Sequence, residues 1–273
     1  MLKKDLFNLS IEKKAIQSSF LKREVVLDLY IPAGITDFSM LSLLLINDGQ
    51  NLDEMKFPLM LDQLWDSNQI HYFITAGIHA GADRKNEYGT SGTIDYEGRG
   101  TKSKEYQQFI LHELLPFIHL HFGIKAFKET AVAGFSLGGL SALDLVWNYS
   151  GVFSTAGVFS GSLWWRSKAL DKGYNEDTDR IMHQNIRKGH YHPGLRFFFT
   201  TGSLDETADR NNNGIIDSVD DTLSLIEELR KKGYNTEYDI KYINFENGRH
   251  DIATWGKAMP LFLLWWMGRG MKN

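Results

Sequence analysis

The segment from Ala131 to Leu140 constrains this chain more than any other. It reads Ala-Val-Ala-Gly-Phe-Ser-Leu-Gly-Gly-Leu, a short apolar strand followed by Gly-x-Ser-x-Gly and the start of a helix. A serine on a sharp strand-to-helix turn exposes its hydroxyl above a sheet, and glycine two residues to either side tolerates the crowded backbone. The pattern therefore predicts that Ser136 is a nucleophile. The alternative is a glycine-rich turn whose serine only caps the next helix.

Length and composition limit the classes of protein that this chain can be. Its 273 residues, 42% hydrophobic and 23% charged, fit one globular α/β domain spanning residues 1–273. The absence of cysteine excludes disulfides, thiolate metal sites and a cysteine nucleophile. A net charge of -4 gives no support for nucleic acid or an anionic membrane as a partner, and it leaves the oligomeric state open.

Hydropathy predicts a soluble protein. The longest apolar run, Met259 to Met267, is interrupted only by Pro260. It is far shorter than the roughly 20 residues needed to span a bilayer, so a buried terminal helix is expected. The N-terminal residues start basic but lack the apolar stretch of a secretory signal. We therefore expect a cytoplasmic protein, or an exported one whose signal lies outside this sequence.

Short apolar runs bounded by turn residues predict seven strands: Val25 to Ile31, Leu41 to Ile46, Tyr72 to Ala76, Thr130 to Ala133, Ala156 to Phe159, Leu195 to Thr200 and Tyr238 to Phe245. Helical patterns lie between them: Tyr106 to His121, Leu137 to Trp147 and Leu223 to Lys232. This alternation predicts a mostly parallel central sheet with helices on both faces.

The residues that would activate Ser136 must follow it in the chain. In α/β-hydrolases the order is serine, then an acid, then histidine. Among nine histidines, only His250 lies beyond the strand that ends at Gly202. His250 is therefore the predicted base, and the alternative is a surface histidine that caps a helix. Asp205 follows the same strand and is the predicted acid, with Glu206 as the alternative.

A serine hydrolase also needs two backbone N–H groups for the oxyanion. Leu137 supplies one by its position after the nucleophile. The loop after the strand Leu41 to Ile46 is expected to supply the other. We assign it to Gln50, with Asn51 as the neighbouring alternative.

Several motifs along the chain resemble one family of α/β-hydrolases. These are Asp48-Gly49-Gln50, Arg84 with Glu87-Tyr88, Glu113-Leu114-Leu115-Pro116, Gly134-Phe135-Ser136-Leu137-Gly138-Gly139, Ser160-Gly161-Ser162-Leu163-Trp164-Trp165 and Gly248-Arg249-His250-Asp251. They are similar in type and order to the esterase family that includes esterase D, ferric-enterobactin, feruloyl and acetyl-xylan esterases. The resemblance runs from about Ser19 to Met267.

This resemblance implies a serine carboxylic-ester hydrolase with a Ser136, Asp205 and His250 triad and no catalytic cofactor. A small-molecule or sugar ester is the expected substrate. Arg84, Trp164 and Trp165 are assigned to the substrate pocket, although the two tryptophans could instead pack over the sheet edge. Two other functions stay open, an acyltransferase and an inactive carbohydrate- or ligand-binding protein.

One segment departs from the family pattern. Residues 209–220 read Asp-Arg-Asn-Asn-Asn-Gly-Ile-Ile-Asp-Ser-Val-Asp, with oxygen side chains at positions 1, 3, 5, 9 and 12 and glycine at position 6. This spacing predicts a structural Ca²⁺ site of the EF-hand kind. The expected ligands are Asp209, Asn211, Asn213, the Ile215 carbonyl, Asp217 and Asp220. The alternative is a polar turn that leads into a helix.

Overall fold

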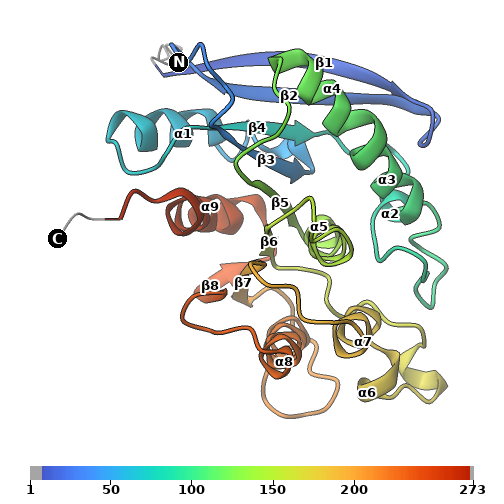
Figure 1. Ribbon diagram of the computed structural model, residues 1–273. Coiled ribbons are helices and arrows are strands. Elements are labelled where there is room, and N and C mark those ends of the chain that lie inside the picture. Colours follow the sequence, from blue (N-terminus) through green and yellow to red (C-terminus); the bar gives the residue numbers. More distant parts are fainter. Residues whose placement is uncertain (1–7, 271–273) are drawn as a thin grey trace.

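A single mixed sheet organises the chain. The computed structural model describes residues 8–270 (Figure 1). Its eight strands lie in the order β1-β2-β4-β3-β5-β6-β7-β8. The strands are β1 (Leu9–Ser18), β2 (Arg23–Pro32), β3 (Ser42–Asn47), β4 (Phe73–Ile78), β5 (Thr130–Phe135), β6 (Thr155–Phe159), β7 (Arg196–Leu204) and β8 (Ile240–Arg249). β2 pairs antiparallel with both β1 and β4, and all pairs from β4 to β8 are parallel. The predicted mostly parallel sheet is confirmed.

Helices cover both faces of this sheet. They are α1 (Phe57–Asp66), α2 (Arg84–Glu87), α3 (Ser103–Phe109), α4 (Leu115–Phe122), α5 (Leu137–Asn148), α6 (Glu176–Asp179), α7 (Ile181–Lys188), α8 (Asp217–Lys232) and α9 (Ile252–Met267). Short 3-10 turns occupy Gly49–Asn51 and Leu170–Lys172, and a π-helical turn at Ile110–Leu114 joins α3 to α4. No helix within residues 8–270 has the length and apolarity needed to cross a bilayer.

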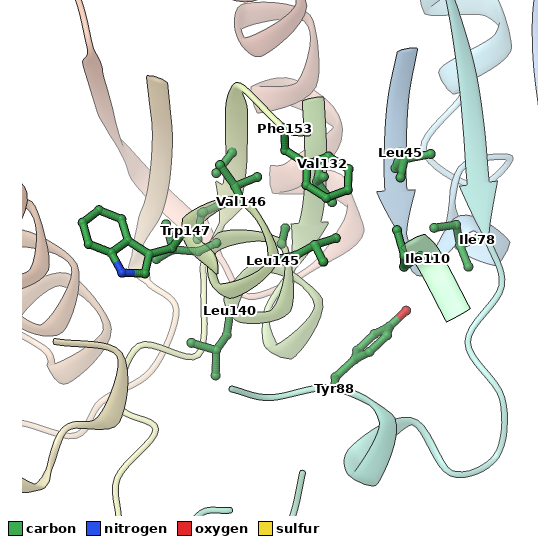
Figure 2. Close-up of a cluster of buried hydrophobic side chains, with 14 of the residues drawn as sticks. Leu45, Ile78, Tyr88, Ile110, Val132, Leu140, Leu145, Val146, Trp147 and Phe153 are labelled. Atoms are coloured by element: carbon green, nitrogen blue, oxygen red, sulfur yellow. The ribbon is translucent and has the colours of Figure 1, made fainter. Parts of the chain in front are cut away.

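Two buried clusters separate the helices into layers. One cluster joins α3, α4, α5, α7 and α8 to the sheet, and the other joins α1 and α9 to the opposite face. Figure 2 shows part of the first cluster, where Leu145 and Val146 of α5 lie near Val132 of β5 and Leu45 of β3. All residues of β3, β4, β5 and β6 are buried, which explains their continuous apolar sequences.

One strand and several helices were absent from the sequence prediction. β1 carries the polar run Glu12-Lys13-Lys14, and its side chains alternate between exposed and half-buried. This pattern is typical of a protected edge strand, where charge prevents further pairing. α1 was also missed. α8 begins at Asp217, six residues before the predicted start, so the end of the calcium-like segment forms its first turn.

Candidate active site

Ser136 occupies the sharp turn between β5 and α5. Its backbone has φ 53° and ψ −121°, a conformation that is strained for a residue with a side chain. A Cβ atom on Gly134 would lie 2.3 Å from the Gly138 carbonyl oxygen, and one on Gly138 would lie 2.7 Å from Asp48 Oδ2. Other atoms approach Gly134 and Gly138 so closely that neither position has room for a side chain. This tight turn holds the serine at the carboxyl end of the sheet.

Two backbone N–H groups near this turn are free. Within residues 8–270, neither Leu137 nor Gln50 donates its N–H to an acceptor. The Asn51 N–H, by contrast, donates to the Asp48 carbonyl oxygen at 3.0 Å. A Cβ on Gly49 would lie 2.3 Å from the Gly77 carbonyl carbon, so only glycine lets this loop press against β4. Of the two alternatives, Gln50 is the residue with an N–H available for an oxyanion.

The carboxyl ends of β7 and β8 meet through glycine. A Cβ on Gly202 would lie 2.4 Å from the carbonyl carbon of Gly248. The Asn247 N–H donates to Ser203 Oγ at 2.8 Å, and the register between the two strands shifts between Gly202 and Leu204. This contact brings the segment that carries Asp205 beside the segment that carries His250.

The two carboxylate oxygens of Asp205 have different surroundings. Its Oδ2 accepts the Gly202 N–H at 2.9 Å, whereas Oδ1 is buried and accepts no hydrogen bond within residues 8–270. Burial raises the pKa of Asp205, whereas the Gly202 N–H, the Ser160 hydroxyl and the His250 charge oppose this shift. Glu206 lies beside the start of α8. Burial raises its pKa, and the Ser218 N–H in the first turn of that helix opposes the rise. Asp205 is therefore the better placed of the two acids.

His250 lies directly before α9, whose first turn is capped by Asp251. The Asp251 carboxylate accepts the Thr254 N–H at 2.8 Å. The His250 ring meets Trp255 edge to face, with ring centroids 5.2 Å apart. Loss of surrounding water lowers the pKa of His250; the Asp205 charge raises it, and the Arg84 charge lowers it. Asp205 and Arg84 thus both act electrostatically on this imidazole.

The three triad candidates are not hydrogen-bonded to one another within residues 8–270 in this conformation. The Ser136 hydroxyl instead lies 3.4 Å from Ser162 Oγ. The Ser162 N–H also donates to the Ser136 carbonyl oxygen at 3.0 Å. Ser162 was not predicted as a site residue, although it lies just beyond the carboxyl end of the buried strand β6, where polar residues gather around a site.

The predicted pocket residues have different environments. Arg84 forms two hydrogen bonds to the buried Asp48 carboxylate, from Nε at 2.6 Å and from Nη2 at 2.7 Å. Tyr88, labelled in Figure 2, accepts the Asp48 N–H at 3.2 Å. Trp165 is fully buried and lies against Gly89 and Gly100, so its indole packs the core and offers no surface to a ligand.

Trp164 remains half-buried, with its ring below the Arg99 guanidinium at 4.9 Å. Trp255 is a site residue that sequence analysis missed. It stacks on Phe135 with ring centroids 5.2 Å apart and donates its Nε1–H to Ser160 Oγ at 3.1 Å. An aromatic residue inside an apolar helix gave no sequence signal beyond core packing.

The calcium-like segment closes on itself through its own side chains. Asp209 Oδ2 accepts the Gly214 N–H at 2.9 Å, and Asn213 Oδ1 accepts the Ile215 N–H at 2.8 Å. The amides of Asn211 and Asn213 both donate to the Asp220 carboxylate at 3.2 Å. Side chains from positions 1, 3, 5 and 12 therefore belong to one small cluster.

Arg210 competes for two of the predicted ligands. Its Nη1 lies 3.1 Å from Asp217 Oδ1, and its Nη2 lies 3.5 Å from Asp220 Oδ2. Across residues 8–270, no group of three or more acidic, histidine or cysteine side chains is arranged to hold a metal ion. The calcium site thus stays a prediction.

The fold and the serine turn define the chain as an α/β-hydrolase. More narrowly, it belongs to the family described as "Putative esterase", whose sequence pattern matches residues 18–265. The family resemblance expected from the motifs is confirmed. Membership places the chain among the serine esterases, enzymes that hydrolyse carboxylic esters.

One protein sequence and several solved structures are similar to this chain at low identity. The uncharacterized protein YjcH of Bacillus subtilis (strain 168) is 23% identical over 254 residues, which cover 91% of this chain and 93% of that protein. The enterobactin esterase FES of Shigella flexneri superposes with a TM-score of 0.71 at 20% identity over 94% of this chain. This chain spans only 59% of that longer enzyme. The siderophore hydrolase EstB of Aspergillus nidulans gives a TM-score of 0.67 at 18% identity, covering 97% of this chain and 98% of that one.

Proposed function

We propose that this protein hydrolyses carboxylic esters through an acyl-enzyme on Ser136. The Ser136 hydroxyl attacks the ester carbonyl carbon while His250 takes its proton, and the Leu137 and Gln50 N–H groups stabilise the oxyanion. His250 then protonates the departing alcohol. Water, deprotonated by His250, releases the acid and restores the serine. No cofactor takes part in these steps.

The observation that carries this proposal is the pairing of a strained serine turn with two free N–H groups. Ser136 has a positive φ, and neither Leu137 nor Gln50 donates to an acceptor within residues 8–270. These two unused N–H groups lie beside the half-buried Ser136 and are available to an oxyanion, which is the arrangement that acyl transfer requires. A serine that served only as a helix cap would account for neither feature.

Asp205 is assigned the role of orienting His250 and stabilising its charged form. Its unpartnered Oδ1 supports this role, since a buried carboxylate oxygen favours a hydrogen-bond donor. In the proposed Michaelis complex, the His250 ring turns so that one nitrogen meets Asp205 and the other meets Ser136. The Ser136 hydroxyl leaves Ser162 when it turns toward His250.

The test compares hydrolysis of p-nitrophenyl acetate and butyrate by wild type, Ser136→Ala and Ser162→Ala. We expect Ser136→Ala to lose at least about a thousandfold in kcat, because the nucleophile is gone. Ser162→Ala is the matched control, a nearby hydroxyl that the mechanism does not consume. Equal rates for wild type and Ser136→Ala would refute the nucleophile.

Two other functions predict different results in hydrolysis, labelling and acyl-acceptor experiments. An inactive binding protein would show no hydrolysis and no labelling of Ser136 by a fluorophosphonate. An acyltransferase would label at Ser136 but deliver the acyl group to an added alcohol faster than to water. The substrate we propose is a small-molecule or sugar ester, consistent with the enterobactin esterase and siderophore hydrolase named among the similar structures.

We also propose that residues 209–220 bind one structural Ca²⁺. The spacing of oxygen side chains and the gathering of Asp209, Asn211, Asn213 and Asp220 support the proposal. Asp217 and the Ile215 carbonyl would complete the ligand set. The segment begins four residues after Asp205. The ion would therefore stiffen the loop that carries Asp205 and would not take part in the reaction.

A further inference from the structure

Arg166 is a half-buried arginine that has no acidic partner among the residues that the structure describes. We infer that it forms a subsite for a carboxylate carried by the substrate, so that this esterase prefers anionic esters to neutral ones. The inference rests on the proposed ester hydrolysis and adds the charge of the substrate to it.

The guanidinium of Arg166 is poorly satisfied by the protein. Its Nη1 and Nη2 groups make only long contacts, 3.4 Å each, to the Trp164 carbonyl oxygen and to the Tyr96 hydroxyl. Its Nε is buried and has no hydrogen-bond partner, and no carboxylate within residues 8–270 pairs with it. An arginine carries five N–H donors, so most of this capacity is unused.

A neighbouring arginine shows what a compensated site looks like. Arg99 lies over the same Trp164 ring, at 4.9 Å, but it pairs with Asp95 and with Glu97. The described part of the chain thus supplies two carboxylates to the Arg99 guanidinium and none to the Arg166 guanidinium. The missing anion at Arg166 is what a ligand would provide.

Aromatic rings hold the face of the Arg166 guanidinium. Its central carbon lies 4.7 Å from the centroid of the Tyr96 ring, 5.8 Å from Tyr174 and 6.0 Å from Trp164. Stacking against a ring uses the flat face and leaves the in-plane N–H groups for hydrogen bonds. A carboxylate, being planar with two oxygens, fits this edge in a bidentate way.

The backbone fixes Arg166 relative to the nucleophile. The Ser162 N–H donates to the Ser136 carbonyl oxygen at 3.0 Å, and the Trp165 N–H donates to the Ser162 carbonyl oxygen at 3.2 Å. The Arg166 carbonyl oxygen then accepts the Tyr96 N–H at 2.9 Å. Arg166 follows Ser162 by four residues, so its Cα lies no more than about 14 Å from the residue that is hydrogen-bonded to the serine turn. This is the distance range of the remote end of a bound ester.

The experiment uses p-nitrophenyl esters of succinate, glutarate and adipate, each with one free carboxylate. Neutral p-nitrophenyl esters of the same chain lengths are compared with them. We expect wild type to favour the anionic ester at one or more lengths, and Arg166→Gln to reduce that ratio of kcat/KM by about tenfold to a hundredfold. Arg166→Lys should keep part of the preference, since it retains the charge and loses the fork.

Controls separate this inference from the proposed function. Lys172→Gln removes one exposed positive charge outside the aromatic cluster and should leave the ratio unchanged. Added salt should lower the wild-type ratio only modestly, because a half-buried pair is screened less than an exposed one. The ratio is independent of how much folded enzyme each variant yields.

Each outcome has one meaning. Hydrolysis of neutral esters with no preference for the anionic series, or an equal loss in Lys172→Gln, overturns the subsite and leaves the esterase proposal standing. No hydrolysis of any ester by wild type would instead overturn the proposed function.

Discussion

The backbones of Gly202 and Gly248 are in contact, and this contact joins the segment that carries Asp205 to the segment that carries His250. A Cβ on Gly202 would lie 2.4 Å from the Gly248 carbonyl carbon and 2.8 Å from Asp205 Oδ1. Two strands can approach this closely only where neither residue has a side chain. The relative position of Asp205 and His250 therefore depends on a pair of glycines that carry no chemistry.

We predict that Gly202→Ala lowers both activity and stability. The added methyl must push the two loops apart, which costs about 1–3 kcal/mol of unfolding free energy and displaces Asp205 from His250. We expect kcat/KM for p-nitrophenyl butyrate to fall at least about tenfold. Gly151→Ala is the matched control, because a Cβ there meets nothing within 4 Å. A Gly202→Ala enzyme with wild-type kinetics would contradict the prediction.

The pH dependence of activity should report His250. The base works only when neutral, and desolvation together with Arg84 places its pKa below the value of 6.5 for a free imidazole. The kcat/KM of wild type should therefore rise with pH to a plateau, with a midpoint below 6.5. Asp205 opposes this shift, so Asp205→Asn should move the midpoint lower still and slow the plateau rate.

Glu206→Gln is the control for this titration, because Glu206 faces the start of α8. It should leave the midpoint where wild type has it. A midpoint that moves in Glu206→Gln and stays fixed in Asp205→Asn would exchange the roles of the two acids.

The Asp48–Arg84 pair should be a stability element. Asp48 is buried, and Arg84 Nε lies 2.6 Å from its Oδ1. Arg84→Gln would leave that carboxylate buried without a cation. Such a loss typically lowers the free energy of unfolding by about 3–5 kcal/mol. We expect a loss near the lower end, about 3 kcal/mol, because part of Arg84 is exposed. Urea unfolding measures it.

Arg230→Gln offers the comparison, since it breaks the exposed pair with Glu227 at 2.8 Å. Such a surface pair contributes about 0–1 kcal/mol. Equal effects of the two substitutions would show that the Asp48–Arg84 pair is no stronger than a surface contact.

Sequence reasoning predicted the elements whose patterns are local. Strands such as β3 and β5 are buried on both faces, so apolar composition alone marks them. The Ser136 turn was predictable because steric crowding dictates glycine at positions fixed in the chain. β1 was missed because an edge strand protects itself with charge and so hides its apolar face.

The finer parts of the site depend on contacts between distant segments. Whether Gln50 or Asn51 keeps a free N–H is decided by the 3-10 turn, which uses the Asn51 N–H internally. Whether Trp165 is a pocket or a core residue is decided by Gly89 and Gly100, which lie more than sixty residues away in the chain and pack against it. No local pattern contains that information.

Asp144 should make the protein less stable as pH rises. Burial raises its pKa from 3.8 to about 6. Its Oδ2 accepts the Ser91 N–H and the Gln107 amide at 2.7 Å each, while Oδ1 has no partner within residues 8–270. The folded state thus keeps a proton that the unfolded chain releases between about pH 4 and 6, so the unfolding free energy falls across that window.

Asp144→Asn should remove this fall. The asparagine keeps a carbonyl oxygen for Ser91 and Gln107 but carries no charge to desolvate. Above pH 6 we expect the variant to be more stable than wild type by about 2–3 kcal/mol, the scale of a shift of about two pKa units. Denaturant melts at pH 4.5, 5.5 and 7.5 measure it, and parallel curves for the two proteins would refute the assignment.

Calcium should stabilise the protein if residues 209–220 bind it. An ion that binds only the folded state adds RT ln(1 + [L]/Kd), about 2.7 kcal/mol at a hundredfold excess over Kd. For a chain of this size that corresponds to a Tm increase of about 5–10 °C. EDTA should reverse the increase and reduce turnover without abolishing it, because the segment adjoins the Asp205 loop. Asp209→Ala should lose the response, whereas Asp171→Ala, an exposed acid outside the segment, should keep it. Wild-type melts that coincide in EDTA and in millimolar calcium, with no binding by calorimetry, would leave the segment as a polar turn in which Arg210 neutralises Asp217 and Asp220.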